Sequence, residues 1–131
     1  MKEKLQNKLY VKHPELFIEK DCDMTKTCMC WGVCVNDGWF YLIDNLCDCI
    51  TSYCKDNQKE IPRAVQVKEK FGELRFYTHG YEDSAIGGMI WFAEHLSNSI
   101  CEFCGSTEDV FQTEDGWVET ICKKCFEKRS R

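Results

Sequence analysis

The chain has 131 residues, of which 44% are hydrophobic and 13% aromatic, and this composition excludes an intrinsically disordered protein. The length allows one sizeable core, so we expect one compact unit with a metal-bound appendage. The net charge of −5 disfavours nucleic acid and anionic membranes as partners, because binding to either depends on Lys and Arg side chains.

No apolar run approaches the roughly 20 residues that cross a bilayer, and residues 1–10 lack the apolar core of a secretory signal. We therefore expect no membrane contact and a location in the cytoplasm. In that compartment eleven cysteines, an odd number, indicate free thiols and metal ligands instead of a disulfide framework.

The first half of the chain predicts two helices with a loop between them. Residues 2–10 show a short helical pattern, and a second turn begins at His13-Pro14. Residues 21–38 contain four cysteines and no sustained periodicity, so we interpret them as an ordered loop. From Trp39 to Tyr53 apolar residues recur every three or four positions, which predicts a helix with Asp37 as its N-cap.

The next segment predicts a β-hairpin followed by another helix. Residues 64–79 alternate with a period of two on both sides of Phe71-Gly72, and the helical period returns over residues 82–97. We therefore predict an α+β core over residues 1–98, with helices packed on a small antiparallel hairpin.

A tight turn at Phe71-Gly72 fixes the register of this hairpin. Lys68 then lies opposite Arg75 and Gln66 opposite Tyr77 on one face. That face is a candidate site for a partner protein or a small anionic ligand such as a nucleotide. The alternative, which we favour, is that nearby glutamates neutralise it, and a bulge would change the pairing. The opposite face is expected to point into the core and consists of Val65, Val67, Leu74 and Phe76.

Residues 99–131 contain two Cys-x-x-Cys pairs, which predict a structural Zn²⁺ site. Each pair supplies two thiolates, and four thiolates complete a tetrahedral site with no open position for a substrate. Residues 110–113 and 117–121 are expected to form short strands, and the second pair continues into a helix. This order is that of a treble-clef finger, packed on the core. The predicted ligands are Cys101, Cys104, Cys122 and Cys125.

The end of the chain is the one basic segment, and it suggests nucleic-acid binding as an alternative role. We favour the interpretation that this basic helix end is simply solvated. The residues concerned are Lys123, Lys124, Lys128, Arg129 and Arg131.

The remaining candidate sites are weaker. His79 and His95 have Glu82 and Glu94 near them in sequence, but no nucleophile motif accompanies them, so no catalytic residue is predicted. Four further cysteines have spacings that match no zinc knuckle, and we interpret them as small buried hydrophobic residues instead of ligands for a second ion. They are Cys22, Cys28, Cys30 and Cys34.

Three segments together resemble a group of small, uncharacterised proteins encoded by phages and prophages. These are CMCWGVCVNDGWFYLIDNLC (28–47), VQVKEKFGELRFY (65–77) and the two C-terminal cysteine pairs. Asn36 stands where the group often has Gly. The resemblance implies a phage-like origin and action in a bacterial cytoplasm, and it brings no catalytic residue.

Small phage proteins of this kind commonly bind and block a host factor. We therefore expect a non-enzymatic, zinc-stabilised protein that binds a host protein, such as a defence component. Nucleic-acid binding by the basic end and binding or turnover of a small anionic ligand at the hairpin face are the alternatives.

Overall fold

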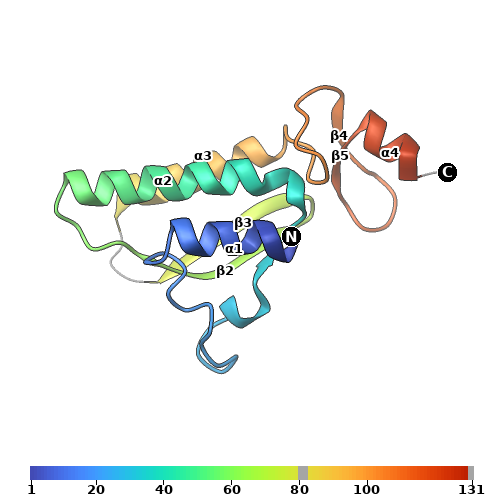
Figure 1. The fold of residues 1–131 in the computed structure, drawn as a ribbon. Coiled ribbons are helices and arrows are strands. Elements are labelled where there is room, and N and C mark those ends of the chain that lie inside the picture. The colour runs from blue at the N-terminus through green and yellow to red at the C-terminus, as the bar shows by residue number, and fades with distance from the viewer. Residues whose placement is uncertain (80–82, 130–131) are drawn as a thin grey trace.

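The computed structural model describes residues 1–79 and 83–129, which form an α+β structure with four α-helices and two small sheets (Figure 1). The elements follow in the order α1 (Glu3–Lys12), the 3-10 helix η1 (Met29–Trp31), β1 (Val33–Cys34), the 3-10 helix η2 (Asp37–Trp39), α2 (Phe40–Asp56), β2 (Arg63–Lys70), β3 (Glu73–His79), α3 (Ser84–Ser97), β4 (Val110–Gln112), β5 (Thr120–Cys122) and α4 (Lys123–Arg129).

Strands β2 and β3 form the predicted hairpin. Lys68 lies opposite Arg75, and Gln66 lies opposite Tyr77, which confirms the register derived from the sequence. Phe71 and Gly72 form the turn with φ angles of +53° and +78°. Positive φ at both central positions is the requirement of a type I′ turn, whose twist matches that of the strands.

The sheet differs from the prediction in two places along β2. Strand β1, inside the segment interpreted as a loop, pairs in parallel with β2. A bulge between Ala64 and Gln66 moves Val65 out of the predicted core face, and Ala64 is fully buried there instead. The Val65 carbonyl turns to the loop because Thr27 Oγ1 and the Cys28 N–H both donate to it, at 3.1 Å.

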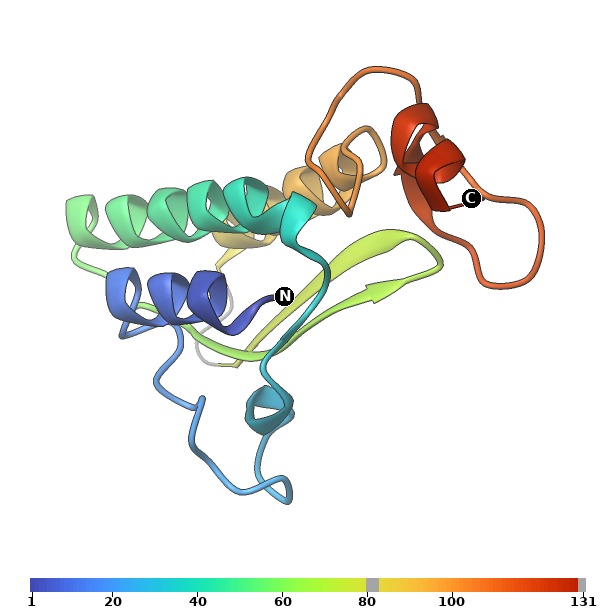
Figure 2. The ribbon, with the colours of Figure 1, turned by 45° about the vertical axis from the view of Figure 1, so that its right-hand side comes forward.

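Helices α2 and α3 lie side by side above the sheet (Figure 2). Helix α2 buries one apolar stripe, including Ile43, Cys47 and Ile50, each fully buried. The prediction of Asp37 as the N-cap was wrong, because Trp39 occupies that position and Asp37 accepts a hydrogen bond from the Lys2 N–H at 2.8 Å.

Helix α3 covers the free edge of the sheet. Its N-cap Asp83 accepts hydrogen bonds from the N–H groups of the first turn. The Leu74 N–H donates to Ser97 Oγ (3.0 Å) and the Phe76 N–H donates to Glu94 Oε2 (3.0 Å). These two side chains satisfy backbone groups that an edge strand otherwise leaves exposed.

The main core lies between these two helices, α1 and the sheet, around the fully buried Trp39 and Phe17. A smaller cluster around Ile121, Cys101 and Cys122 lies in residues 99–129, which we call the finger. None of the helices in residues 1–79 and 83–129 is long and apolar enough to cross a membrane.

Candidate metal centre and adjoining surfaces

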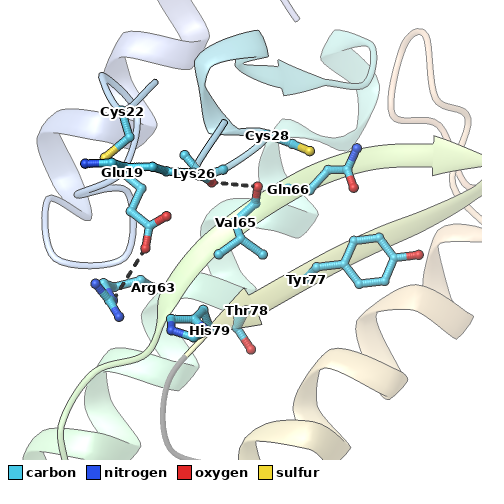
Figure 3. A pocket seen from close by; sticks show the side chains of 11 residues that line it. Glu19, Cys22, Lys26, Cys28, Arg63, Val65, Gln66, Tyr77, Thr78 and His79 are labelled. Atoms are coloured by element: carbon cyan, nitrogen blue, oxygen red, sulfur yellow. Dashed lines mark hydrogen bonds and ion pairs between the residues drawn. The ribbon is translucent and has the colours of Figure 1, made fainter. Parts of the chain in front are cut away.

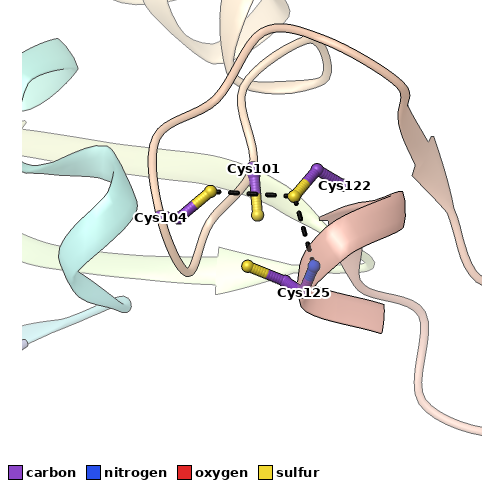
Figure 4. Close-up of side chains that lie close together, drawn as sticks. All are labelled: Cys101, Cys104, Cys122 and Cys125. Carbon is purple, nitrogen blue, oxygen red and sulfur yellow. Dashed lines mark hydrogen bonds between the residues drawn. The ribbon is translucent and has the colours of Figure 1, made fainter. Parts of the chain in front are cut away.

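The fold brings together the four cysteines of the finger (Figure 4). Cys101 and Cys104 lie on the turn that follows α3, Cys122 ends β5, and Cys125 lies in the first turn of α4. Their Sγ atoms all lie within 4.8 Å of one another. This arrangement can hold a metal ion.

The spacing of the sulfurs fits a tetrahedral thiolate site. Zn–S bonds of about 2.3 Å at tetrahedral angles place neighbouring sulfurs about 3.8 Å apart. Cys104 Sγ and Cys122 Sγ are 3.7 Å apart, whereas a disulfide needs about 2.05 Å, and both cysteines are free thiols. The donor set therefore fits a soft divalent ion.

The electrostatics of the cluster also favour a cation. Burial acts to raise the pKa of Cys101, but backbone N–H groups of Cys104, Cys122 and Phe103 outweigh it and lower that pKa to about 7. Burial and the neighbouring thiols raise the pKa of Cys125 to about 12. Four adjacent sulfurs therefore cannot all ionise unless a positive charge lies between them.

Glu102, inside the first Cys-x-x-Cys pair, links the finger to the core. Its carboxylate accepts hydrogen bonds from Asn36, through the backbone N–H (3.0 Å) and the side-chain amide (2.9 Å). The Glu102 side chain is buried, and burial raises its pKa above the usual value. The Gly38 N–H donates to the Glu102 carbonyl at 2.7 Å. A Cβ at Gly38 would lie 2.2 Å from the Cys101 carbonyl oxygen, so only glycine fits there.

A second link joins the finger to the tip of the β2–β3 hairpin. The buried hydroxyl of Thr120 donates to the Gly72 carbonyl at 2.5 Å. Glu69 bridges the two parts: its Oε1 accepts from Trp117 Nε1 and its Oε2 from the Gly72 N–H, both at 3.1 Å. The hydrogen bonds that join the finger to the hairpin tip and to Asn36 have no signal in the sequence, because each joins residues at least 48 positions apart.

Exposed aromatic side chains gather where the hairpin tip meets the finger. Phe71 and Trp117 are each 74% exposed, and Phe111 contacts Phe126 edge to face with ring centroids 5.4 Å apart. A hollow of about 500 Å³ is lined by Phe111, Trp117 and Phe126 together with Arg129. We call Phe71, Phe111, Trp117 and Phe126 the tip surface.

The basic end of the chain is less basic than its sequence indicates. The Arg129 guanidinium forms a double hydrogen bond with the Glu119 carboxylate, which raises the pKa of Arg129. Lys123, Lys124 and Lys128 are exposed on α4, and Arg131 lies outside the described residues.

The predicted hairpin face is likewise partly neutralised. Arg75 forms a hydrogen-bonded ion pair with Glu73 on its own strand, which raises the pKa of Arg75. Lys68 lies over the Tyr77 ring, 5.9 Å from its centroid. The favoured interpretation, that neighbouring glutamates neutralise this face, therefore holds for Arg75, which is paired with Glu73.

Two other residues of that face, Gln66 and Tyr77, line a cavity of about 710 Å³ (Figure 3). It lies between the bulged end of the hairpin and the loop that follows α1. Arg63, paired with Glu19 at 3.5 Å, and the exposed His79 also border it. The remaining lining residues are Cys22, Lys26, Thr27, Cys28, Val65 and Thr78.

The interpretation of the N-terminal cysteines as buried hydrophobic residues was wrong. Cys28, Cys30 and Cys34 are exposed and Cys22 is half-buried, because the segment runs along the surface beside β2. His95 is exposed and stacks on Trp91 with ring centroids 6.1 Å apart. Glu94 is engaged by the β3 backbone, and Glu82 lies outside the described residues.

A second cluster that the sequence did not indicate joins α1 to α2. His13 Nε2 lies 2.7 Å from Asp44 Oδ1, and Lys12 Nζ lies 3.0 Å from Asp44 and 3.3 Å from Asp48. The Lys12 ammonium group already supplies a positive charge to these carboxylates, so the cluster is explained as an ion-pair network.

No protein-family model, curated protein sequence or solved structure matches this chain.

Proposed function

We propose that this chain is a zinc-stabilised binding protein without catalytic activity that engages a host protein in a bacterial cytoplasm. Four thiols suit Zn²⁺, whereas Mg²⁺ and Ca²⁺ prefer oxygen ligands. A turn bearing two ligands, a hairpin and a helix start bearing the others is the treble-clef order. Zn²⁺ bound by four cysteines has no open position for a substrate, so it contributes folding free energy.

The observation that carries the binding role is the conformation of Phe71. It is 74% exposed and has a φ of +53°, a region that non-glycine residues other than Asn and Asp rarely adopt. Asn-Gly is the usual sequence of such turns, so a phenylalanine here lowers stability without filling the core. Strain of this kind is typical of functional positions.

The surroundings of Phe71 support a protein partner. Trp117 is equally exposed, and Glu69, which accepts its hydrogen bond, also holds the turn. Aromatic side chains grouped on a rigid support are typical of the residues that dominate protein interfaces. The metal centre provides that support, because Thr120 beside Cys122 is bonded to the turn.

The resemblance to phage-encoded proteins suggests the class of partner. A host protein that acts against phage, blocked by occupation of its surface, is consistent with a small binding protein. The partner is then a folded protein with an apolar pocket for the ring of Phe71 or Trp117.

Affinity capture with matched variants tests this proposal. The wild-type chain should retain a specific bacterial protein, and Phe71→Asn should reduce the recovery of that protein at least about fivefold. The same variant should have a higher melting temperature, because Asn adopts the positive φ of this turn with less strain than Phe. Val11→Ser, at an 81% exposed position of α1, is the control and should leave capture unchanged. Equal recovery with Phe71→Asn and wild type would contradict the role of the tip surface.

The predicted hairpin face is the alternative contact. Reversal of its charges in Lys68→Glu/Arg75→Glu should leave capture unchanged if the tip surface is the contact. Loss of capture in this variant, with wild-type recovery in Phe71→Asn, would transfer the proposal to that face.

Nucleic-acid binding by α4 is disfavoured because Arg129 is already paired with Glu119. Titration of salt in a DNA- and RNA-binding assay decides this point: we expect no binding at low salt. Binding that weakens steeply with added salt would support the nucleic-acid role.

The cavity beside the bulge favours a second candidate function, binding of a small anionic ligand. Lys26, Arg63 and His79 supply cationic or imidazole groups and Gln66 supplies an amide, and the lining also includes Glu19, the ion-pair partner of Arg63. A ligand at 100 times its Kd stabilises a protein by about 2.7 kcal/mol. A rise in melting temperature with a nucleotide, absent in Arg63→Ala, would support this candidate, and no rise would remove it.

A further inference from the structure

Helix α3 exposes a wide apolar surface that the tip surface does not include. Trp91 is 70% exposed, Phe92 62% and Leu96 37%. The helix has one Asp, Glu, Lys or Arg side chain, Glu94, and it accepts a hydrogen bond from the β3 backbone. The outer face of α3 therefore carries no Asp, Glu, Lys or Arg side chain, and His95 is its ionisable group, in a chain in which 30% of residues are charged.

Two adjacent glycines in the same helix have no explanation within one copy of the chain. A Cβ at Gly87 or Gly88 would meet nothing within 4 Å. Glycine lowers helix stability relative to alanine, so an open position offers no internal compensation for it. Close approach by another backbone is a reason for glycine at such a position.

Four of the exposed residues of α3 form one ridge, in which two small residues are followed by two large ones. Ser84, Gly88, Phe92 and Leu96 follow one another at intervals of four, and all four are exposed. When two such helices lie antiparallel, Gly88 of each meets Phe92 of the other, and Ser84 meets Leu96. A parallel pair would instead oppose large residues to large ones.

From this pattern we infer that two copies of the chain associate as a homodimer through α3, antiparallel about a two-fold axis. A two-fold interface must be complementary to itself, and the ridge satisfies that condition. The net charge of −5 on each copy opposes association in general, and the α3 face adds no Asp, Glu, Lys or Arg side chain to that repulsion at the contact itself.

The exposed area fits a weak, reversible contact between two copies. At 150–250 Å² per aromatic side chain, Trp91 and Phe92 expose on the order of 300 Å² in each copy, and thus about 600 Å² in a pair. Leu96, His95 and the backbone at the glycines extend the patch. The total approaches the roughly 1,000 Å² that a specific interface requires.

Sedimentation of the reduced, metal-loaded protein from about 1 µM to about 200 µM tests the dimer. We expect a species of twice the chain mass to appear within this range. A monomer throughout, or larger aggregates without a defined dimer, would overturn the inference.

Substitutions on the ridge test the antiparallel register. Gly88→Phe should weaken dimerisation at least about tenfold, while its helix content matches that of the wild type because the position is open in the monomer. The swap Gly88→Phe/Phe92→Gly places large against small again and should restore the dimer. Failure of the swap to restore it would contradict this register.

A control variant and a third measurement separate the dimer from other uses of the face. Phe71→Lys, on the tip surface, should leave dimerisation unchanged. Loss of the dimer in this variant would overturn the assignment of the interface to α3. Sedimentation with lipid vesicles should show no binding. Vesicle binding by a protein that remains monomeric would assign the face to a membrane surface instead.

Discussion

Asn36 donates two hydrogen bonds to the buried carboxylate of Glu102, one from its backbone N–H and one from its side-chain amide. Glu102 lies between two of the four clustered cysteines, so this pair joins the metal centre to the segment that leads into α2. The finger and the core are therefore expected to stabilise each other.

Removal of the Asn36 amide should destabilise the protein. In Asn36→Ala the backbone hydrogen bond remains and the side-chain bond is lost, which should cost about 1.5–3 kcal/mol for a bond to a charged group. Urea unfolding should show a lower midpoint with an unchanged slope. Asn45→Ala, which removes an exposed bond to the Tyr41 carbonyl, is the control and should have a small effect. Equal midpoints for Asn36→Ala and the control would contradict this link.

Gly38 should tolerate no larger residue. In Gly38→Ala the new Cβ would meet the carbonyl of Cys101, so the first cysteine turn must move, at a cost of about 1–3 kcal/mol. Metal affinity, measured by competition with a chelator, should fall with stability. At concentrations at which the chain is monomeric, Gly87→Ala should instead raise stability, because the position is open and alanine favours the helix. If Gly38→Ala retained wild-type stability and affinity, the close approach would be refuted.

The pH dependence of stability should report on Asp83. The Lys59 ammonium, 2.6 Å away, lowers the pKa of Asp83 to about 2, and the N–H groups of Ala85 and Ile86 and the Tyr53 hydroxyl contribute. Because this pKa lies below its unfolded value of 3.8, the carboxylate stabilises the folded state above that pH. Its contribution is lost as the pH falls through about 2.

Asp83→Asn retains the helix cap and removes the charge. Wild type should exceed this variant in stability at pH 7, and the difference should vanish in strong acid. Comparison of the two proteins at each pH cancels the effects of acid on the thiols. A difference that stays constant from neutral to strongly acidic pH would show that the ion pair does not stabilise the fold.

The features that the sequence predicted correctly depend on short-range rules. The two-residue turn at Phe71-Gly72 fixes the β2–β3 register, since a change of one residue would place Lys68 and Arg75 in the core. The spacing within each Cys-x-x-Cys pair similarly brings two sulfurs together through one turn of backbone. Helix α2 was predicted because its apolar residues share one face.

The features that the sequence missed depend on contacts between distant segments. Strand β1 has only two residues, too few for a periodic signal, and its pairing depends on β2. At the bulge, the Val65 carbonyl accepts hydrogen bonds from Thr27 and Cys28, which lie 37 or more positions earlier in the chain. The sequence gives no signal that Glu102 is buried, because that role depends on its hydrogen bonds with Asn36.

The metal content of freshly purified, reduced protein tests the central claim most directly. Elemental analysis should find one zinc ion per chain, and cobalt substitution should give the absorption of a tetrahedral thiolate site. Removal of the ion should unfold the finger and lower the stability of the core. Protein that contains no transition metal, and that keeps the same melting temperature in the presence of a strong chelator, would contradict the account.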